Sequence, residues 1–164
     1  MKKILLILMA MFAFGLQNVS AQDAPLKIVT NHPDFSIKVK RCAASGKTVI
    51  IDLILNNNGT NDVDVKEVRG GGGSCISEAY DDEGNIYQSD NLKVKIANRT
   101  SYEVYDTGSF SIPSGVPMRL SIQLSNVPQS AESIARLKLI FFCKVWGLNE
   151  EKPVRINNIP ITRD

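Results

Sequence analysis

Apolar and polar residues alternate in short segments along most of this chain, and turn-forming residues separate the segments. In residues 35–40, 92–96 and 118–124, every second residue is apolar. A period of two indicates β-strands that bury one face and expose the other. Since no long segment has the spacing of an amphipathic helix, the alternation predicts an all-β fold.

Two further segments predict the centre of the fold. Residues 48–55 are rich in β-branched residues and apolar at several positions on both faces, which is typical of a central strand. The strongest predicted strand covers residues 137–146, and one of its faces consists of Leu137, Leu139, Phe141, Cys143 and Val145. Weaker signals predict strands at 63–68 and 102–110, an edge strand at 153–161 and one helical turn at 129–135.

Turn signals indicate how these strands connect. The acidic, glycine-containing residues 81–85 lie between the short segments 75–80 and 86–88, which predicts a β-hairpin. Residues 43–46 predict a turn, and the four glycines at 70–73 predict a loop, because a glycine run cannot continue a regular element. Together the segments predict an antiparallel, immunoglobulin-like β-sandwich of about seven to nine strands.

Residues 1–21 have the composition of a cleavable signal peptide. Two lysines precede an apolar run over residues 4–16, and small residues follow it up to Ala21. The run is shorter than the roughly 20 residues of a membrane helix, and no second such run exists. We therefore expect an exported bacterial protein, periplasmic or extracellular, without membrane insertion of the mature chain. Residues 22–164 have the length of a single β-sandwich domain.

The balance of charge limits the classes of partner. The expected signal peptide holds two of the 19 lysine and arginine residues and none of the 17 acidic residues, so the mature chain is neutral overall. A nucleic-acid-binding protein carries a basic face. Neutrality therefore argues against such a face, against nucleic acid as a partner, and against a field that steers a strongly charged partner.

Five stretches of the chain follow a pattern known from one family. They contain a strand that ends in asparagine, an acidic-glycine hairpin followed by tyrosine, and a proline-glycine turn before a strand, in residues 49–57, 79–87, 113–115, 120–128 and 137–142. This pattern resembles the bacterial secreted immunoglobulin-like domains related to the immunoprotective extracellular antigens. The resemblance implies an immunoglobulin-like fold outside the cytoplasm, without an assigned activity. The glycines at 70–73 depart from the family pattern.

Three cysteines are the first candidates for chemistry. An oxidising compartment favours a disulfide, and three cysteines leave one unpaired. If the first three strands run up, down and up, Cys42 and Cys75 lie at the same end of the sandwich, which makes them the candidate pair. Cys143 lies on the apolar face of its strand, where a thiol behaves as a small hydrophobic group. Other pairings and free thiols remain open.

A catalytic alternative uses Cys75 as a nucleophile. The glycine-rich segment beside it could hold an oxyanion, and His32, the single histidine, would have to act as the base. Nothing local in the sequence lowers the pKa of this thiol, and His32 lies in a segment without a strand pattern. A serine triad lacks its Gly-x-Ser-x-Gly turn. The sequence thus assigns no catalytic residue.

Two loops are candidates for cofactor or metal sites. Residues 45–48 lack the first glycine of a phosphate-binding loop, and a strand follows them where that loop needs a helix. Starting at Asp81, the sixth and twelfth positions are Ile86 and Leu92, which excludes a helix–loop–helix calcium site, although a calcium site built from several loops stays open. No cysteine or histidine pair has zinc spacing. We therefore expect no cofactor and assign no metal site.

Aromatic and basic residues complete the candidates. Flat rings can stack on sugars or on protein partners, and half-buried packing in the sheet is the alternative for the same rings. The candidate ligand platform consists of Tyr80, Tyr87, Tyr102, Tyr105 and Trp146. Lysines alternate in residues 38–41 and 93–95, which we interpret as solvated strand faces that discourage edge-to-edge aggregation.

The sequence supports three functions from different classes. The first is a non-enzymatic exported β-sandwich module that binds an envelope protein or a glycan through loops or a sheet edge. The second is a thiol-dependent envelope hydrolase centred on Cys75. The third is a structural domain that assembles by strand addition, because an exposed sheet edge can accept another chain.

Overall fold

The computed structural model describes residues 25–30, 34–69, 77–97, 110–143 and 152–163 of the 164-residue chain. Their regular structure consists of twelve β-strands and one 3-10 helix, η1, at Ser89–Asn91. The strands form two sheets, and nearly all neighbouring strands are antiparallel. The predicted all-β class is confirmed.

One sheet has five strands in the order β12-β2-β3-β9-β7. The two longest, β2 and β3, form a hairpin, and β9 pairs with the other edge of β3. β12 is the exception to antiparallel pairing, because it runs parallel to β2. The strands cover β2 Phe35–Ser45, β3 Thr48–Asn57, β7 Leu92–Ile96, β9 Met118–Leu124 and β12 Thr162–Arg163.

The other sheet has seven strands, and β10 lies at its centre. β11 pairs with one edge of β10, while β5 and β4 pair with successive halves of the other edge. β1, β8 and β6 extend the sheet beyond β11, β4 and β5. The strands cover β1 Lys27–Val29, β4 Val63–Arg69, β5 Glu78–Tyr80, β6 Ile86–Tyr87, β8 Phe110–Ile112, β10 Ser133–Cys143 and β11 Lys152–Pro160.

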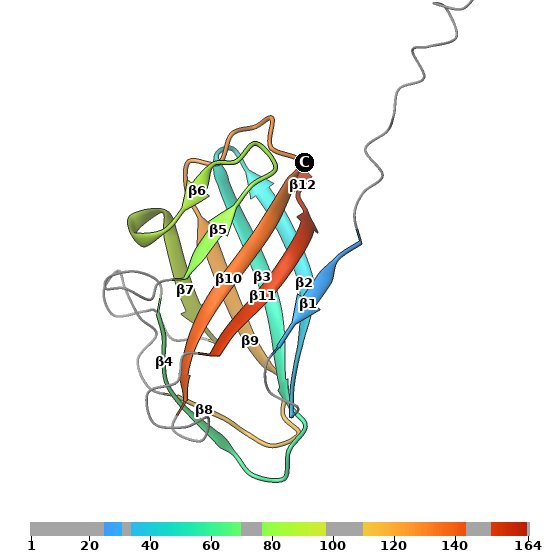
Figure 1. The fold of residues 1–164 in the computed structure, drawn as a ribbon, viewed down its shortest axis with the longest axis vertical. Coiled ribbons are helices and arrows are strands. Elements are labelled where there is room, and N and C mark those ends of the chain that lie inside the picture. Colours follow the sequence, from blue (N-terminus) through green and yellow to red (C-terminus); the bar gives the residue numbers. More distant parts are fainter. Residues whose placement is uncertain (1–24, 31–33, 70–76, 98–109, 144–151, 164) are drawn as a thin grey trace, which may run out of the picture.

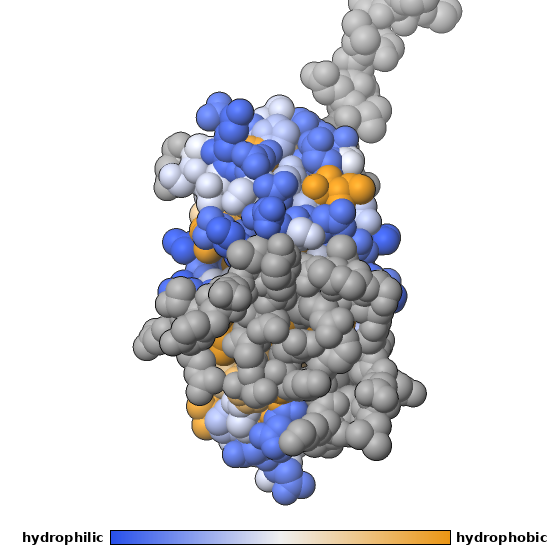
Figure 2. Space-filling view, turned by 90° about the vertical axis from the view of Figure 1, so that its left-hand side faces the viewer, coloured by the Kyte–Doolittle hydropathy of each residue, from blue (hydrophilic) through white to orange (hydrophobic). Residues whose placement is uncertain are grey.

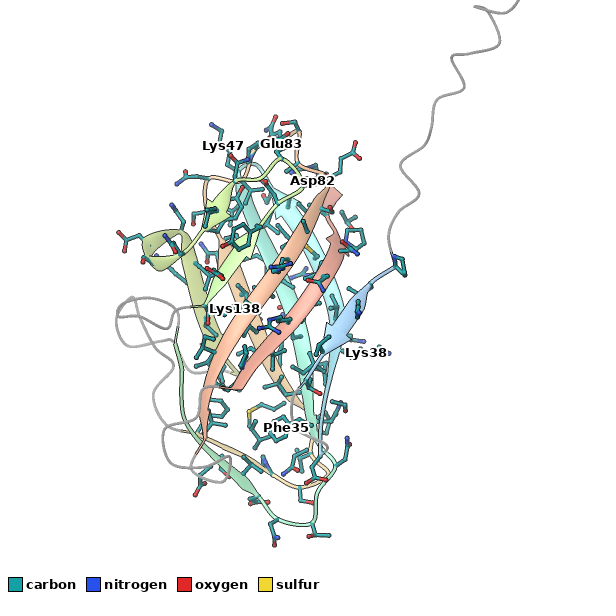
Figure 3. The ribbon with its side chains drawn as sticks, viewed as in Figure 1. Phe35, Lys38, Lys47, Asp82, Glu83 and Lys138 are labelled. Atoms are coloured by element: carbon teal, nitrogen blue, oxygen red, sulfur yellow. The ribbon has the colours of Figure 1, made fainter. Side chains whose placement is uncertain are left out.

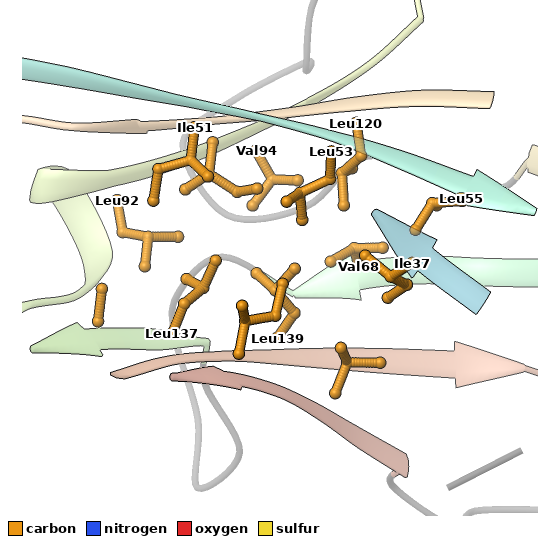
Figure 4. Packing of buried hydrophobic residues seen from close by; sticks show 14 of the residues in the cluster. Ile37, Ile51, Leu53, Leu55, Val68, Leu92, Val94, Leu120, Leu137 and Leu139 are labelled. Carbon is orange, nitrogen blue, oxygen red and sulfur yellow. The ribbon is translucent and has the colours of Figure 1, made fainter. Parts of the chain in front are cut away.

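The two sheets lie face to face, with β10 and β11 in front of β2, β3 and β9 in Figure 1. Figure 4 shows the core between them, where aliphatic side chains of β3 and β9 meet those of β10. Leu53, Leu120, Leu137 and Leu139 are completely buried there. The alternating pattern of the sequence therefore produces two apolar faces, and each sheet buries its face against the other.

A β-bulge in β2 changes which residues face the core. The pairing with β3 skips one residue between Val39 and Arg41, so Lys40 has no partner in the register. Before the bulge, alternate residues up to Val39 face the core; after it, Cys42 does, and both Lys40 and Arg41 are exposed. The bulge thus places two consecutive cations on the outer face of the sheet.

The β2–β3 hairpin turns later than the sequence indicates. β2 continues through Ser45, and the turn consists of Gly46 and Lys47 rather than residues 43–46. Gly46 has a φ of 58°, a backbone conformation that side-chain-bearing residues rarely adopt. Glycine at this position therefore permits the tight connection between two long strands.

Several other sequence predictions need correction or fall outside the described residues. Residues 129–135 contain a turn followed by the start of β10 instead of a helical turn. The predicted edge strand at 153–161 corresponds to β11, which lies between β1 and β10. Five of the twelve strands have three residues or fewer, which explains why the predicted number was lower. Residues 102–109 and 144–146 lie outside the described part.

The core predicts a strong effect of truncation at Leu53. We expect Leu53→Ala to lower the free energy of unfolding by about 2–5 kcal/mol, because it leaves a cavity at a fully buried site. Ile86→Ala is the matched control: this aliphatic side chain is 53% exposed, so its loss should cost within about 0.5 kcal/mol. Urea unfolding measures both values, and equal effects would contradict the described core.

Candidate functional site

Six cationic residues gather on the outer face of the five-stranded sheet. They come from β2, from β9 and from the edge strand β7, and all six are exposed. We call this surface the basic face; its residues are Lys38, Lys40, Arg41, Lys93, Lys95 and Arg119. Lys38, labelled in Figure 3, lies on β2 at the side of the molecule. The two lysine segments are far apart in the sequence, and the strand order brings them onto one surface.

Asp52 lies at the centre of the basic face and is the one acidic residue in the strands of this sheet as the structure describes them. Its side chain is nearly buried. Arg41 donates from Nε and Nη2 to Oδ2 at 3.1 and 3.0 Å, and Arg119 donates from Nη2 to the same oxygen at 2.9 Å. Ser121 donates its hydroxyl to Oδ1. One carboxylate therefore holds two guanidinium groups together.

The surroundings of Asp52 keep it ionised. Burial alone would raise its pKa, but hydrogen bonds from Ser121 and Arg119 and the positive charges of Arg119 and Arg41 outweigh burial. The pKa of Asp52 consequently lies below its ordinary value. The carboxylate is an anion at neutral pH and fixes the two arginines by charge-assisted hydrogen bonds.

The register aligns the basic face in rows across the sheet. Arg41 pairs with Asp52, Asp52 pairs with Ser121, and Ser121 pairs with Lys95. Neighbouring strands lie about 4.8 Å apart, so this row from β2 to β7 spans about 14 Å. A second row contains Lys38 and Arg119, with Ile54 between them. The face is thus a continuous cationic surface and not a single charged point.

The basic face corrects the expectation drawn from overall charge. Neutrality of the mature chain argued against any basic face and any field for a charged partner, but many acidic residues lie in connections between strands instead of on this sheet. Asp82 and Glu83, for example, lie at the upper end of the molecule in Figure 3. A sum of charges over the sequence therefore does not show where the charges lie on the described surface.

The acidic hairpin at the upper end is a structural element. Asp81 Oδ1 accepts hydrogen bonds from the backbone N–H groups of Glu83 and Asn85, and Oδ2 accepts from the Asn85 amide and the Tyr87 hydroxyl. Burial acts to raise the pKa of Asp81, but these bonds outweigh it and lower the pKa. Both carboxylate oxygens are occupied in closing the predicted hairpin, so Asp81 is not a candidate calcium ligand.

The candidate aromatic platform is only partly within the described residues. Tyr87 is buried, and its hydroxyl donates to Asp81, so its ring packs inside the protein and offers no surface to a ligand. Tyr80 is half-buried and pairs with Arg136 on β10. Tyr102, Tyr105 and Trp146 lie outside the described residues. The two described tyrosines agree with the packing alternative.

The cysteine predictions remain largely untested. Cys42 is a buried free thiol in the structure, and burial raises its pKa to about 12 despite the positive charge of Arg163. Such a thiol is unreactive at neutral pH. Cys75 and His32 lie outside the described residues, so both the pairing with Cys42 and the catalytic alternative stay predictions. For Cys143, the structure describes the strand position but not the side chain.

The remaining motif predictions concern turns and metals. Residues 45–48 contain the two-residue β2–β3 turn and the strand residues on either side of it, as the argument against a phosphate-binding loop predicts. In the described part of the chain, no group of three histidine, cysteine or acidic residues could hold a metal ion. The described residues contain no helix with the length and apolar composition of a membrane span.

Large apolar side chains on the described surface are scattered. The exposed ones are Leu26, Ile86 and Val116, from three separate segments. Figure 2 shows the molecule from the side of β4 and β7, where apolar residues form small patches among hydrophilic ones. The basic face is therefore a more distinctive surface feature than any apolar patch in this part of the structure.

Asp52 and Asp81 predict how stability depends on pH. Both have a folded-state pKa below the ordinary 3.8, so the unfolded chain takes up protons first as the pH falls. Their stabilisation is complete above about pH 5 and is lost as the pH falls through the folded-state pKa values. We expect the urea midpoint to fall over this range, and to fall less steeply in Asp52→Asn and in Asp81→Asn. An unchanged slope in both variants would contradict this account.

Comparisons with known proteins give no family for this chain. No family model matches it, and no curated protein matches it. Among solved structures, a family 123 glycoside hydrolase from Clostridium perfringens has a TM-score of 0.39 and 12% identity. The match covers 85% of this chain but only 27% of the hydrolase.

A second solved structure is self-complemented MyfA, the major subunit of Myf fimbriae from Yersinia enterocolitica, in complex with galactose. It has a TM-score of 0.38 and 12% identity, and the match covers 83% of this chain and 100% of the fimbrial subunit. Both TM-scores lie below 0.5, so neither likeness carries an argument about the function of this chain. The candidate site therefore depends on the geometry of the basic face itself.

Proposed function

We propose that this chain is an exported, non-catalytic β-sandwich module that binds an envelope protein or a glycan through the basic face. The observation that carries the proposal is the gathering of six exposed cations around Asp52 on one sheet. Export to the periplasm or the cell exterior rests on the composition of residues 1–21. The immunoglobulin-like assignment is part of the same proposal.

The chemistry of the basic face supports binding over catalysis. Lysine and arginine are donors that hold anions, and arginine keeps its proton under all physiological conditions. The carboxylate of Asp52 accepts hydrogen bonds on both oxygens, and its lowered pKa makes it a weak base. The hydroxyl of Ser121 donates to this carboxylate, which is too weak a base to activate that hydroxyl as a nucleophile. The groups on this face can therefore attract and orient an anionic partner.

The distribution of charge also favours a defined binding surface. The seven-stranded sheet also carries exposed cations, among them Arg136 and Arg155, and its Lys138 forms an ion pair with Glu78 at 3.4 Å. The basic face differs in the arrangement of its arginines around Asp52. On the basic face, two arginines share one carboxylate, which leaves a positive charge in excess. An excess of one sign on a surface raises the association rate with an oppositely charged partner and makes binding sensitive to salt.

Charge reversal on the edge strand tests this proposal. We expect Lys93→Glu/Lys95→Glu to weaken retention of the envelope partner about tenfold or more, because it replaces attraction by repulsion. The measurement is retention of envelope-extract components of the producing cell on the immobilised protein, followed by elution with increasing salt.

The matched control is Arg136→Glu/Arg155→Glu. These exposed arginines lie on β10 and β11 of the other sheet, and their reversal changes the net charge by the same amount. We expect this variant to retain the same components as the unmodified protein. Equal loss in both variants would mean that net charge and not the basic face determines binding, and equal retention in all three proteins would overturn the proposal.

A further inference from the structure

This inference rests on the proposed function and specifies the ligand and its central contact. We propose that the basic face binds an acidic polysaccharide, and that Arg41 and Arg119, held together by Asp52, form a clamp for one of its carboxylate or sulfate groups. The lysines of β2 and β7 then contact neighbouring charged groups of the same polymer. We call Arg41, Asp52 and Arg119 the arginine clamp.

The clamp is preorganised by a shared acceptor. Nitrogens of both guanidinium groups lie about one hydrogen bond from the same Asp52 oxygen, at 3.0 Å for Arg41 and 2.9 Å for Arg119. Two guanidinium groups at such a separation repel each other unless an anion lies between them. Asp52 supplies that anion from a nearly buried position, so the pair exists before a ligand arrives. Preorganisation lowers the entropy cost of binding.

The arginine clamp carries a net positive charge and is accessible to solvent. One carboxylate neutralises one of the two arginines, which leaves one positive charge at the centre of the face. The side chains of Arg41 and Arg119 are still 57% and 58% exposed, whereas that of Asp52 is 7% exposed. A guanidinium fork matches the oxygen spacing of carboxylate and other oxyanions and binds them with two parallel hydrogen bonds. A ligand oxyanion can therefore approach from solvent and complete the neutralisation.

The extent of the basic face points to a polymer and not to a small anion. Lys95 lies in the same row as Arg41, on the far edge of the sheet, and Lys38 lies in the row of Arg119. These cations are spread over a surface wider than a single monosaccharide. A ligand that neutralises all of them must carry repeated negative charges along its length.

The composition of the outer face favours a polysaccharide over other polyanions. In the described strands of this sheet, the outer face carries no aromatic side chain, so it lacks the rings that stack on neutral sugars or nucleic-acid bases. Centres of protein interfaces are enriched in aromatic residues and depleted of lysine, whereas four of the six cations of this face are lysines. Gln123 pairs with Lys93 and Ser121 pairs with Lys95 in the register, so uncharged polar side chains lie beside these cations and can bond sugar hydroxyls.

Five defined probes, with single-stranded DNA as a sixth, distinguish the possible ligands of the full protein. They are polygalacturonate, heparin, neutral dextran, polyglutamate and vesicles of phosphatidylcholine with 30% phosphatidylglycerol, a composition chosen to be roughly that of an anionic bilayer surface. We expect polygalacturonate or heparin to bind at low salt. An excess of dextran of up to about 1,000-fold should not displace either polymer, which serves as an order-of-magnitude criterion for specificity. Tighter binding of polyglutamate, of the vesicles or of an added single-stranded DNA would overturn the polysaccharide assignment.

A conservative double substitution tests the clamp separately from the charge. Arg41→Lys/Arg119→Lys keeps every positive charge but removes both guanidinium forks. We expect its affinity for the better acidic polysaccharide to fall about tenfold, while the salt dependence of binding keeps its slope, because the number of cations is the same. The control Arg136→Lys/Arg155→Lys, on the other sheet, should bind as the unmodified protein does. Urea unfolding of both variants verifies that each is folded.

The outcomes separate this inference from the proposed function. If Lys93→Glu/Lys95→Glu loses the polysaccharide but the Arg41→Lys/Arg119→Lys protein binds it unchanged, the basic face binds by charge alone and the clamp is overturned. If none of the polyanions binds the unmodified protein while an envelope protein is still retained through the basic face, the proposed function survives and the polysaccharide assignment falls. If charge reversal affects no binding at all, both are wrong.

Discussion

The apolar side chains that β3, β9 and β10 direct into the space between the two sheets hold this molecule together. Leu53, Leu120 and Leu139 belong to one buried cluster that both sheets share, so neither sheet is stable without the other. Because stability is concentrated in the inward positions, the outward positions of the same strands are free to vary. The five-stranded sheet uses that freedom to carry cations, and its centre adds a buried anion.

Asp52 turns a set of like charges into an ordered surface. Burial of an unpaired carboxylate in a sheet would be costly, but here three side chains donate to it, and its pKa falls below the ordinary value. In return, the carboxylate limits the motion of two long arginine side chains that would otherwise sample many conformations. The β2 bulge contributes to the same surface, because it turns both Lys40 and Arg41 outward.

The sequence predicts the class and most strands of this fold because alternation is a local signal. Residues 48–55, 92–96 and 118–124 lie in β3, β7 and β9, and their apolar positions form the core. The basic face could not be predicted in this way, since it depends on strand order: β7 pairs with β9, while β2 pairs with β3. A charge sum also hides how charge is distributed. The available signal for the basic face was that lysines occupy every second position in two separate strands. Whether these lysines lie on one surface depends on which strands pair.

The chain crosses from one sheet to the other through a single residue near its C-terminus. Ile161 separates β11, in the seven-stranded sheet, from β12, in the five-stranded sheet, and its side chain packs against the core. Its N–H donates to Glu132 O, and Arg163 donates to the carbonyl oxygens of Pro128 and Ala131 in the connection between β9 and β10. Two covalent crossings are thus tied together at one corner. Separating the two sheets at this corner would therefore have to break these hydrogen bonds as well as the packing of Ile161 against the core.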